Sequence, residues 1–294
     1  MDKSYFQFRN KIVRPIIASA CVAAFVILGA VNAFANHPVF VEGNCLGDGA
    51  AARTLVPPGT CGDYDGDGRI GTAEDTDMPF DRVFGTINAA LGSAGINQNG
   101  MITIVASGIF PETVTLLGNV TLQGASGVEA IIDAVLQGEA GSGGRQNAPG
   151  IVVNSTTNNA VILRNITSRN WTSGIRIMGN SRVSIDNCRI ENNVNYGIEI
   201  LDNARVTISK TKVRATGFRI GATGGFPFAN APNPGIGIEF DDASSGSIYQ
   251  TSVSSSFSTG ISDVSTGSVC AFLVNVFDNN SNLRNIVPSS LPCS

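Results

Sequence analysis

The sequence predicts an all-β chain that winds into a stacked solenoid. Short segments that open with glycine and then alternate aliphatic with other residues recur along it, and their glycines are 24, 23, 38 and 25 residues apart (Gly150, Gly174, Gly197, Gly235 and Gly260). A period near two dozen, with one insertion, is typical of coils that stack on one another. Val, Ile, Thr, Ser and Asn dominate these segments and favour strands and tight turns over helices.

Residues one period apart support this register. Inward aliphatic residues recur, as Ile175 and Ile198 do, and a single coil is too thin to bury them alone. Outward residues form pairs of opposite charge, which we expect on neighbouring strands about 4.8 Å apart. The predicted pairs are Arg176 with Glu199, Asp186 with Lys210, and Glu191 with Arg214.

Residues 1–35 are predicted to be an export signal. Basic residues precede an apolar run over residues 16–30, and Ala33-Phe34-Ala35 offers a small-x-small cleavage site. Its removal would leave a secreted protein, extracellular or periplasmic, with no membrane association. An uncleaved anchor is one alternative, and lipidation at Cys21 is another.

The charge balance argues against a nucleic-acid partner. The formal net charge is -4, only 14% of residues are charged, and the predicted ion pairs leave no basic patch. We therefore expect an N-terminal segment over residues 36–79 and a solenoid domain over residues 80–294, with no nucleic acid bound to either.

Five cysteines follow the predicted signal. In an oxidising compartment, proximity along the chain pairs Cys45 with Cys61 and Cys270 with Cys293. Cys188 is left over, and we interpret it as a small buried filler rather than a nucleophile.

The most specific local motif is an acidic loop at residues 63–74. Acids stand at its positions 1, 3, 5 and 12, with Gly66 at position 6 and Ile70 at position 8, as in an EF-hand calcium loop. Pro57-Pro58-Gly59 precludes the usual entering helix, so an isolated structural calcium (Ca²⁺) site is predicted, and a merely acidic turn is the alternative. The predicted ligands are Asp63, Asp65, Asp67, Arg69 (through its carbonyl group) and Glu74.

Three features before the repeats carry a resemblance to a family. Residues 80–91 predict a short amphipathic helix that caps the open core, with Val83, Phe84, Ile87 and Leu91 on one face. The phrase Gly108-x-Phe110-x-Glu112 and the strand 120–124 follow. Over about residues 80–286 the chain resembles right-handed parallel β-helix proteins of the pectin lyase-like group, which implies a single-stranded right-handed parallel β-helix with a short N-terminal capping helix.

The resemblance leaves the activity open. That group includes polysaccharide lyases, glycoside hydrolases, esterases, epimerases, phage tailspikes and proteins without known chemistry. The only histidine here is His37, at the predicted new N-terminus, so the histidine of the polygalacturonase-like hydrolases and of Ser-His catalysis is missing. A lyase needs only a cation or calcium and an Arg or Lys base, and it stays possible in principle.

Two insertions in the period, residues 136–149 and 218–234, precede Gly-Ile strands and should leave the coil at the same corner, three coils apart. Aromatic residues between and on these walls suit stacking on sugar rings, whereas burial beneath the loops is the alternative. They are Trp171, Tyr196, Phe226 and Phe228.

A charged edge is the second candidate site. Arg182 should stack on Arg205, and like charges on neighbouring strands destabilise unless they are neutralised. Ordinary turn residues are the alternative for the acids at this corner. In a functional edge, the arginines would bind a uronate or sulfate, and Asp241 with Asp242 would hold a metal or act as acid and base. The acids are Asp202, Glu239, Asp241 and Asp242.

Two function classes follow. The first is a non-catalytic secreted β-helix that binds glycans or forms part of a cell-surface layer, because no catalytic constellation is recognisable. The second is a polysaccharide lyase or other carbohydrate-active enzyme that acts on acidic polysaccharide, which only the resemblance supports. The sequence alone leaves open whether the protein is an enzyme.

Overall fold

The structure is a computed structural model that describes residues 39–41, 54–55, 69–70, 83–92, 100–134, 148–217, 235–291 and 293. The chain divides into two units, Met1–His37 and Pro38–Ser294, and every described residue belongs to the second. The predicted export signal, Cys45 and Cys61 lie outside the described residues, as do Phe226, Phe228 and all calcium ligands except Arg69.

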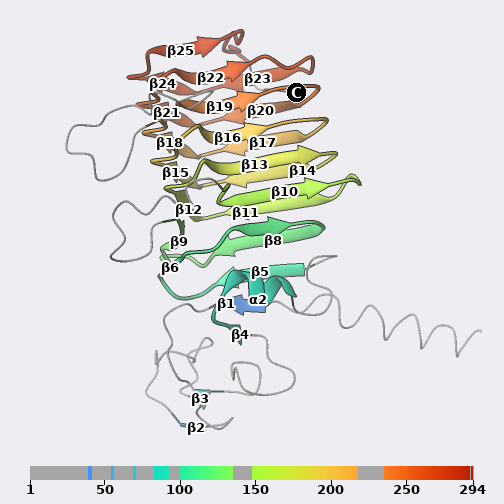
Figure 1. The fold of residues 1–294 in the computed structure, drawn as a ribbon, viewed down its shortest axis with the longest axis vertical. Helices are drawn as coiled ribbons and strands as arrows, with labels where there is room; N and C mark the ends of the chain where they lie inside the picture. The colour runs from blue at the N-terminus through green and yellow to red at the C-terminus, as the bar shows by residue number, and fades with distance from the viewer. Residues whose placement is uncertain are drawn as a thin grey trace, which may run out of the picture. The chain divides into compact units, whose positions relative to one another are not determined.

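The described chain winds through seven coils, and each coil adds one strand to each of three parallel sheets (Figure 1). Sheet 1 has the order β23-β20-β17-β14-β11-β8-β5-β1-β4. Its strands are β1 (Val39–Val41), β4 (Val83–Phe84), β5 (Gly100–Ile104), β8 (Asn119–Gly124), β11 (Ala160–Arg164), β14 (Arg182–Asp186), β17 (Arg205–Ser209), β20 (Ser245–Tyr249) and β23 (Val269–Phe272).

Sheet 2 has the order β24-β21-β18-β15-β12-β9-β6, and sheet 3 has the order β25-β22-β19-β16-β13-β10-β7. The strands of sheet 2 are β6 (Gly108–Phe110), β9 (Ala130–Asp133), β12 (Ile166–Arg169), β15 (Arg189–Glu191), β18 (Lys212–Arg214), β21 (Ser252–Ser254) and β24 (Asn275–Phe277). Those of sheet 3 are β7 (Val114–Leu116), β10 (Ile151–Ser155), β13 (Ser173–Gly179), β16 (Tyr196–Ile200), β19 (Ile236–Phe240), β22 (Thr259–Asp263) and β25 (Ser281–Arg284).

We number the coils from coil 1 (β5, β6 and β7) to coil 7 (β23, β24 and β25). A separate antiparallel pair joins β2 (Thr54–Leu55) to β3 (Arg69–Ile70). Strand β3 is the part of the predicted calcium loop that the structure describes, so calcium binding stays a prediction.

The predicted inward register is confirmed. Ile175 pairs with Ile198, and further aliphatic residues stack between coils 4 and 5. Because successive residues of a strand point to opposite faces, these residues fill one continuous core while their neighbours face outward. The paired residues in coils 4 and 5 are Val183 with Val206, Ile185 with Ile208, and Ile190 with Val213.

Two predicted charge pairs are confirmed and one is wrong. Arg176 Nε lies 2.7 Å from Glu199 Oε2, and Arg214 Nε lies 2.6 Å from Glu191 Oε2. Asp186 instead pairs with Ser209, whose hydroxyl donates to its carboxylate at 2.8 Å. Lys210 stands one residue further on, at the corner between sheets 1 and 2.

The glycine that opens the strand of coil 5 also differs from the prediction. Ile238 pairs with Ile198, so Gly237 rather than Gly235 continues the glycine column. A Cβ added to Gly237 would lie 2.5 Å from the Gly260 carbonyl oxygen, which explains why this inner corner needs glycine. Gly235 belongs to the base of the insertion.

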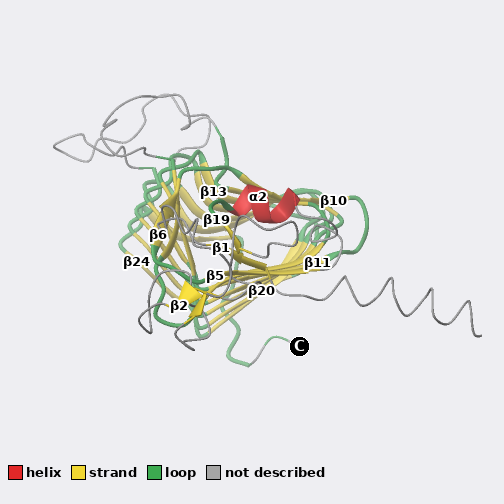
Figure 2. Ribbon diagram, turned by 90° about the horizontal axis from the view of Figure 1, so that it is seen from below, coloured by secondary structure: helices red, strands yellow, loops and turns green. Residues whose placement is uncertain are grey.

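The capping helix is shorter than predicted. Helix α2 spans Ile87–Gly92, whereas Val83–Phe84 forms strand β4 and pairs with β1. The carboxylate of Glu112 accepts the backbone N–H groups of Ile87 (2.7 Å) and Asn88 (2.9 Å), which satisfies two free donors of the first turn. The helix packs against β1, β4, β5 and β7 at the N-terminal end of the coils (Figure 2), so it covers the open core as predicted.

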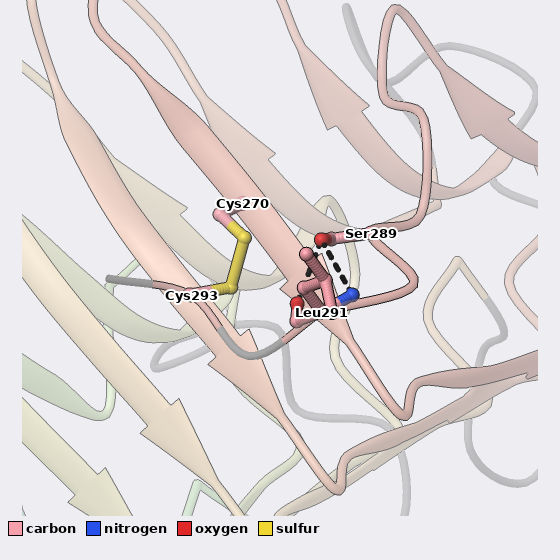
Figure 3. Close-up of a disulfide and its surroundings, with 4 residues drawn as sticks. All are labelled: Cys270, Ser289, Leu291 and Cys293. Carbon is pink, nitrogen blue, oxygen red and sulfur yellow. Dashed lines mark hydrogen bonds between the residues drawn. A yellow bond between two sulfur atoms is a disulfide. The ribbon is translucent and has the colours of Figure 1, made fainter.

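The C-terminal tail closes the last coil on one side. The predicted disulfide between Cys270 and Cys293 is present, with the two Cα atoms 5.8 Å apart (Figure 3). Ser289 forms a parallel bridge with Phe272, and its N–H donates to the Ala271 carbonyl at 2.7 Å. The tail therefore bonds to the free edge of sheet 1, where an unpaired strand would otherwise invite association.

Candidate functional site

The outer face of sheet 1 carries a groove of about 800 Å³. Its floor is the outward column Ile162, Ser184, Thr207 and Ser247, one residue from each of coils 3 to 6. Cys270, Ser289 and Cys293 also line it, so the tail stands at its C-terminal end.

Arg182 and Arg205 stand at the edge of this groove. They pair directly across β14 and β17, in a column that continues to Ala160 on one side and Ser245 on the other. Both are exposed, and within the described part of the chain neither has an ion-pair partner. The predicted register of Arg182 over Arg205 is confirmed, and no carboxylate of the described residues neutralises the two.

An aromatic pair that the sequence analysis missed lies on the same face. The rings of Tyr249 and Phe272 stack with centroids 5.6 Å apart and planes 10° apart, and Tyr249 is exposed. They continue the outward column of Arg164, Asp186 and Ser209 across coils 6 and 7. Their separation of 23 residues, one period, is the signal that reveals them in the sequence.

The aspartates of the predicted edge serve the turn between sheets 3 and 1. Asp202 accepts the Gly179 N–H at 2.8 Å, and Asp242 accepts the Asp202 N–H at 3.1 Å. Asp241 accepts the N–H of Asp242 at 2.7 Å. These bonds support the turn interpretation of Asp241 and Asp242, and no ion pair joins any of the three to the arginines among the described residues.

Trp171 is a core residue rather than part of an exposed aromatic strip. Its side chain is fully buried, and its indole N–H donates to the Ile132 carbonyl at 3.1 Å. Tyr196 lies on the outer side of sheet 3 but is only 7% exposed. Neither ring is available for a sugar to stack on, so the burial alternative holds for both.

The bases of the two insertions lie where the sequence placed them. One follows β9 in coil 2 and the other follows β18 in coil 5, so both leave between sheets 2 and 3, three coils apart. Gly217 and Gly235 flank the second insertion with φ angles of 91° and 82°. A Cβ on Gly217 would lie 2.7 Å from the Cα of Gly235, so the chain leaves and returns at one point.

Beside that point, sheet 3 carries a buried carboxylate pair that the sequence analysis did not single out as a pair. Glu199 and Glu239 are paired across β16 and β19, and each is 7% exposed. Glu199 accepts bonds from the Ser173 hydroxyl at 2.8 Å and from Arg176 Nε at 2.7 Å. These two donors satisfy its charge.

Glu239 has a different environment. Burial, and after it the negative charges of Asp241 and Glu199, raise the pKa of its carboxyl group from an ordinary value of 4.5 to about 7. A hydrogen bond from the Tyr196 hydroxyl and the charge of Arg284 lower it, by less. Near neutral pH the carboxyl group of Glu239 therefore carries a proton part of the time.

Cys188 is free and buried, as predicted. Burial raises the pKa of its thiol to about 12, so it stays protonated and is a poor nucleophile. Across the described residues, no three His, Cys, Asp or Glu side chains are grouped so as to hold a metal ion. None of the described helices is long and apolar enough to cross a membrane.

Three parallel sheets that wind around one core, with ladders of aliphatic residues on the inside, define a parallel β-helix. A family model for the right-handed beta helix region matches residues 113–282, so the chain belongs to the right-handed β-helix family. No curated protein and no solved structure matches the chain. Because such folds host many chemistries, the function has to be argued from the surface described above.

Proposed function

We propose that the protein is a secreted, non-catalytic β-helix that binds an acidic polysaccharide in the groove on sheet 1. The single observation that carries this proposal is the pair Arg182 and Arg205, two exposed, stacked cations without an ion-pair partner among the described residues. The resemblance to the pectin lyase-like group supports carbohydrate as the ligand.

The chemistry of the groove favours carboxylate or sulfate groups on a sugar chain. Two arginines that face each other on strands about 4.8 Å apart carry like charges that repel, and an anion bound by both removes that cost while it accepts charge-assisted hydrogen bonds. The hydroxyl groups of Ser184, Thr207 and Ser247 offer donors and acceptors for sugar hydroxyls. Tyr249 and Phe272 supply an apolar ring surface beside them.

Binding to polygalacturonate and dextran sulfate, with neutral dextran as the control polymer, tests the proposal by titration calorimetry. Arg182→Ala and Arg205→Ser copy the residues that neighbouring coils carry in the same column, Ala160 and Ser245, so both variants should fold. Each should weaken binding of the acidic polymers about tenfold or more, since a hydrogen bond to a charged group contributes about 1.5–3 kcal/mol. Arg284→Gln, on sheet 3, is the matched control and should bind like the wild type. Equal affinity in all variants would contradict the proposal.

We also propose that residues 63–74 bind one structural calcium ion and that the chain is exported. The spacing of Asp63, Asp65, Asp67 and Glu74 supports the first, and the Cys270–Cys293 disulfide supports an oxidising compartment. Native mass spectrometry of the mature chain with added calcium should give one bound ion that Glu74→Gln removes. An unchanged mass in calcium would refute the site.

A carbohydrate-active enzyme is the second candidate, and one observation favours it. Glu239, whose pKa is raised to about 7, lies beside Glu199, and acid–base cleavage of a glycosidic bond uses a proton-bearing carboxyl group together with a second carboxyl group. Because each of the two is only 7% exposed, a substrate would first have to displace the side chains that cover them. A lyase that removes a proton from a uronate through an arginine is the other form of this candidate.

Incubation of the mature protein and calcium with a panel of acidic polysaccharides separates the two candidates. New reducing ends that disappear in Glu239→Gln would establish hydrolysis, and unsaturated uronate that disappears in Arg205→Ala would establish elimination. Tight binding without either product supports the non-catalytic function.

A further inference from the structure

A second small cavity, of about 300 Å³, opens where sheet 1 turns into sheet 2. Arg189, Lys210 and Lys212 line it, together with Asn187. Glu129 is the one carboxylate in its lining, against three cations. The cavity spans coils 2 to 5, and its three cations stand on coils 4 and 5, the coils that also carry the arginine pair of the groove.

The cations of this cavity are poorly neutralised. Arg189 pairs directly with Lys212 across β15 and β18, a second stack of like charges. Arg189 reaches Glu191 at 3.4 Å, but the same carboxylate oxygen is held by Arg214 at 2.6 Å. In the described chain, Lys210 and Lys212 form no ion pair.

Lys210 also breaks a structural pattern. The two preceding coils carry Asn165 and Asn187 at this corner, and Asn187 donates its side-chain amide to Asn165 at 2.8 Å. All three residues have positive φ, between 48° and 55°, which asparagine tolerates better than lysine. Coils 6 and 7 carry Gln250 (φ 47°) and Leu273 (φ 53°) at the same corner, so this corner accepts several residue types, and asparagine is the one that fits its backbone with the least strain.

The charge is concentrated on these two coils. Residues 182–191 and 205–214 together hold six Lys or Arg residues and two acids, a net charge of +4, in a chain whose net charge is -4. The chain has four lysines, and the two that follow the predicted export signal are Lys210 and Lys212. The sequence analysis missed this basic patch because it assigned Lys210 to Asp186.

We infer that one acidic polysaccharide chain crosses coils 4 and 5 at right angles to the stack, from the groove to this corner cavity. We call the residues that it meets the cationic band: Arg182, Arg205, Lys210, Lys212 and Arg189. Five residues, about 16 Å of strand, separate Arg205 from Lys210. The ligand is therefore a polymer with repeated negative charge, since a single uronate is too short to reach both ends.

This inference rests on the proposed function. Binding of oligomers of different length tests the crossing path separately from the groove itself. Lys210→Asn and Lys212→Ser copy the neighbouring coils at Asn187 and Ser252, so the double variant should unfold at the wild-type temperature or above it. Its affinity for a galacturonate dimer should equal that of the wild type, whereas its affinity for a long oligogalacturonate should fall tenfold or more. Arg205→Ser should lose affinity for both lengths.

Each other outcome has a definite meaning. If the double variant binds long oligomers as the wild type does, the crossing path is wrong and the groove proposal stands. If the wild type binds neither length, both proposals fall. If a duplex DNA oligonucleotide of equal charge binds to the band as tightly as the long oligogalacturonate, the assignment of the ligand as a polysaccharide is overturned.

Discussion

Glu199 and Glu239 lie side by side on neighbouring strands of sheet 3, and both are almost completely buried. Two carboxylates about 4.8 Å apart would repel each other strongly in such a site. The structure avoids this repulsion by giving Glu199 an arginine and a serine as donors, while burial raises the pKa of Glu239 to about 7. The folded chain therefore keeps a proton on Glu239 up to a higher pH than the unfolded chain does.

Loss of this proton should make the protein less stable as the pH rises. Because the pKa of Glu239 is about 7 in the folded chain against an ordinary 4.5, the folded state binds the proton more tightly than the unfolded state does. The contribution of Glu239 to the free energy of unfolding is full below pH 4.5, declines between pH 4.5 and 7, and is lost above pH 7. Urea unfolding at a series of pH values measures it.

Glu239→Gln should remove this decline, since an amide keeps the shape of the carboxyl group without its charge. At pH 8 the variant should exceed the wild type by about 1–2 kcal/mol, a figure reduced from the full value of the pKa shift to allow for solvent screening. A wild-type stability that rises from pH 5 to 7 as much as that of the variant would show that Glu239 is ionised throughout.

Trp171 gives a direct spectroscopic test of its burial. It is the only tryptophan of the chain, and it is fully buried with its indole N–H bonded to a main-chain carbonyl. Its emission should be blue-shifted, resistant to quenching by iodide, and unchanged when a glycan that binds to the groove is added. Quenching by a neutral or acidic glycan would place the ligand on Trp171 and contradict the sheet 1 site.

Deletion of residues 218–234 should leave the β-helix folded. Gly197 stands four positions after Asn193 in coil 4, and the deletion gives the same offset from Thr216 to Gly237 because Gly217 would then precede Gly235 directly. The far-ultraviolet circular dichroism spectrum should keep its β signature, and binding to the groove on sheet 1 should persist.

The deletion also removes Phe226 and Phe228, two of the predicted sugar-binding residues. Lost binding in a deletion variant that still unfolds cooperatively would place the ligand on the insertion instead. Phe226→Ala with Phe228→Ala in the full-length chain should reproduce that loss.

Cys293→Ser should loosen the tail from sheet 1. The disulfide joins residues 23 positions apart, and a loop of that length contributes about 3 kcal/mol by the chain-entropy estimate. Thermal unfolding should begin at a lower temperature, and size-exclusion chromatography should show self-association, because the edge of β23 becomes free to pair. Ser290→Ala, at an exposed position of the same tail, is the control and should behave as the wild type. An unchanged melting temperature in Cys293→Ser would mean that the bridge does not contribute to stability.

The winding could be predicted from the sequence because its signal is repeated. Each inward aliphatic residue has a partner one period away, so an error at one coil is corrected by the next, as at Ile175 and Ile198. The helix prediction had no such check. Val83 and Phe84 fit a helical face, but pairing with β1, over forty residues earlier in the chain, selects a strand instead.

The candidate site was harder to predict from the sequence because the positions of its residues depend on local changes in coil length. Arg169 pairs with Glu191, 22 residues on, whereas Ile175 pairs with Ile198, 23 residues on. The corner of coil 3 is therefore one residue shorter than that of coil 4, which puts Trp171 in the inward column. There its main-chain N–H donates to the Asn193 side-chain oxygen at 3.1 Å. A miscount of one residue likewise paired Asp186 with Lys210.

The separation of inward from outward columns has a consequence for how this surface changes over generations. A substitution such as Arg182→Ala or Lys212→Ser only copies the residue that an adjacent coil carries at the same position. It should therefore change the free energy of unfolding very little. The preference of this surface for one polymer over another can therefore change one coil at a time, while the thermal stability of the whole β-helix stays constant.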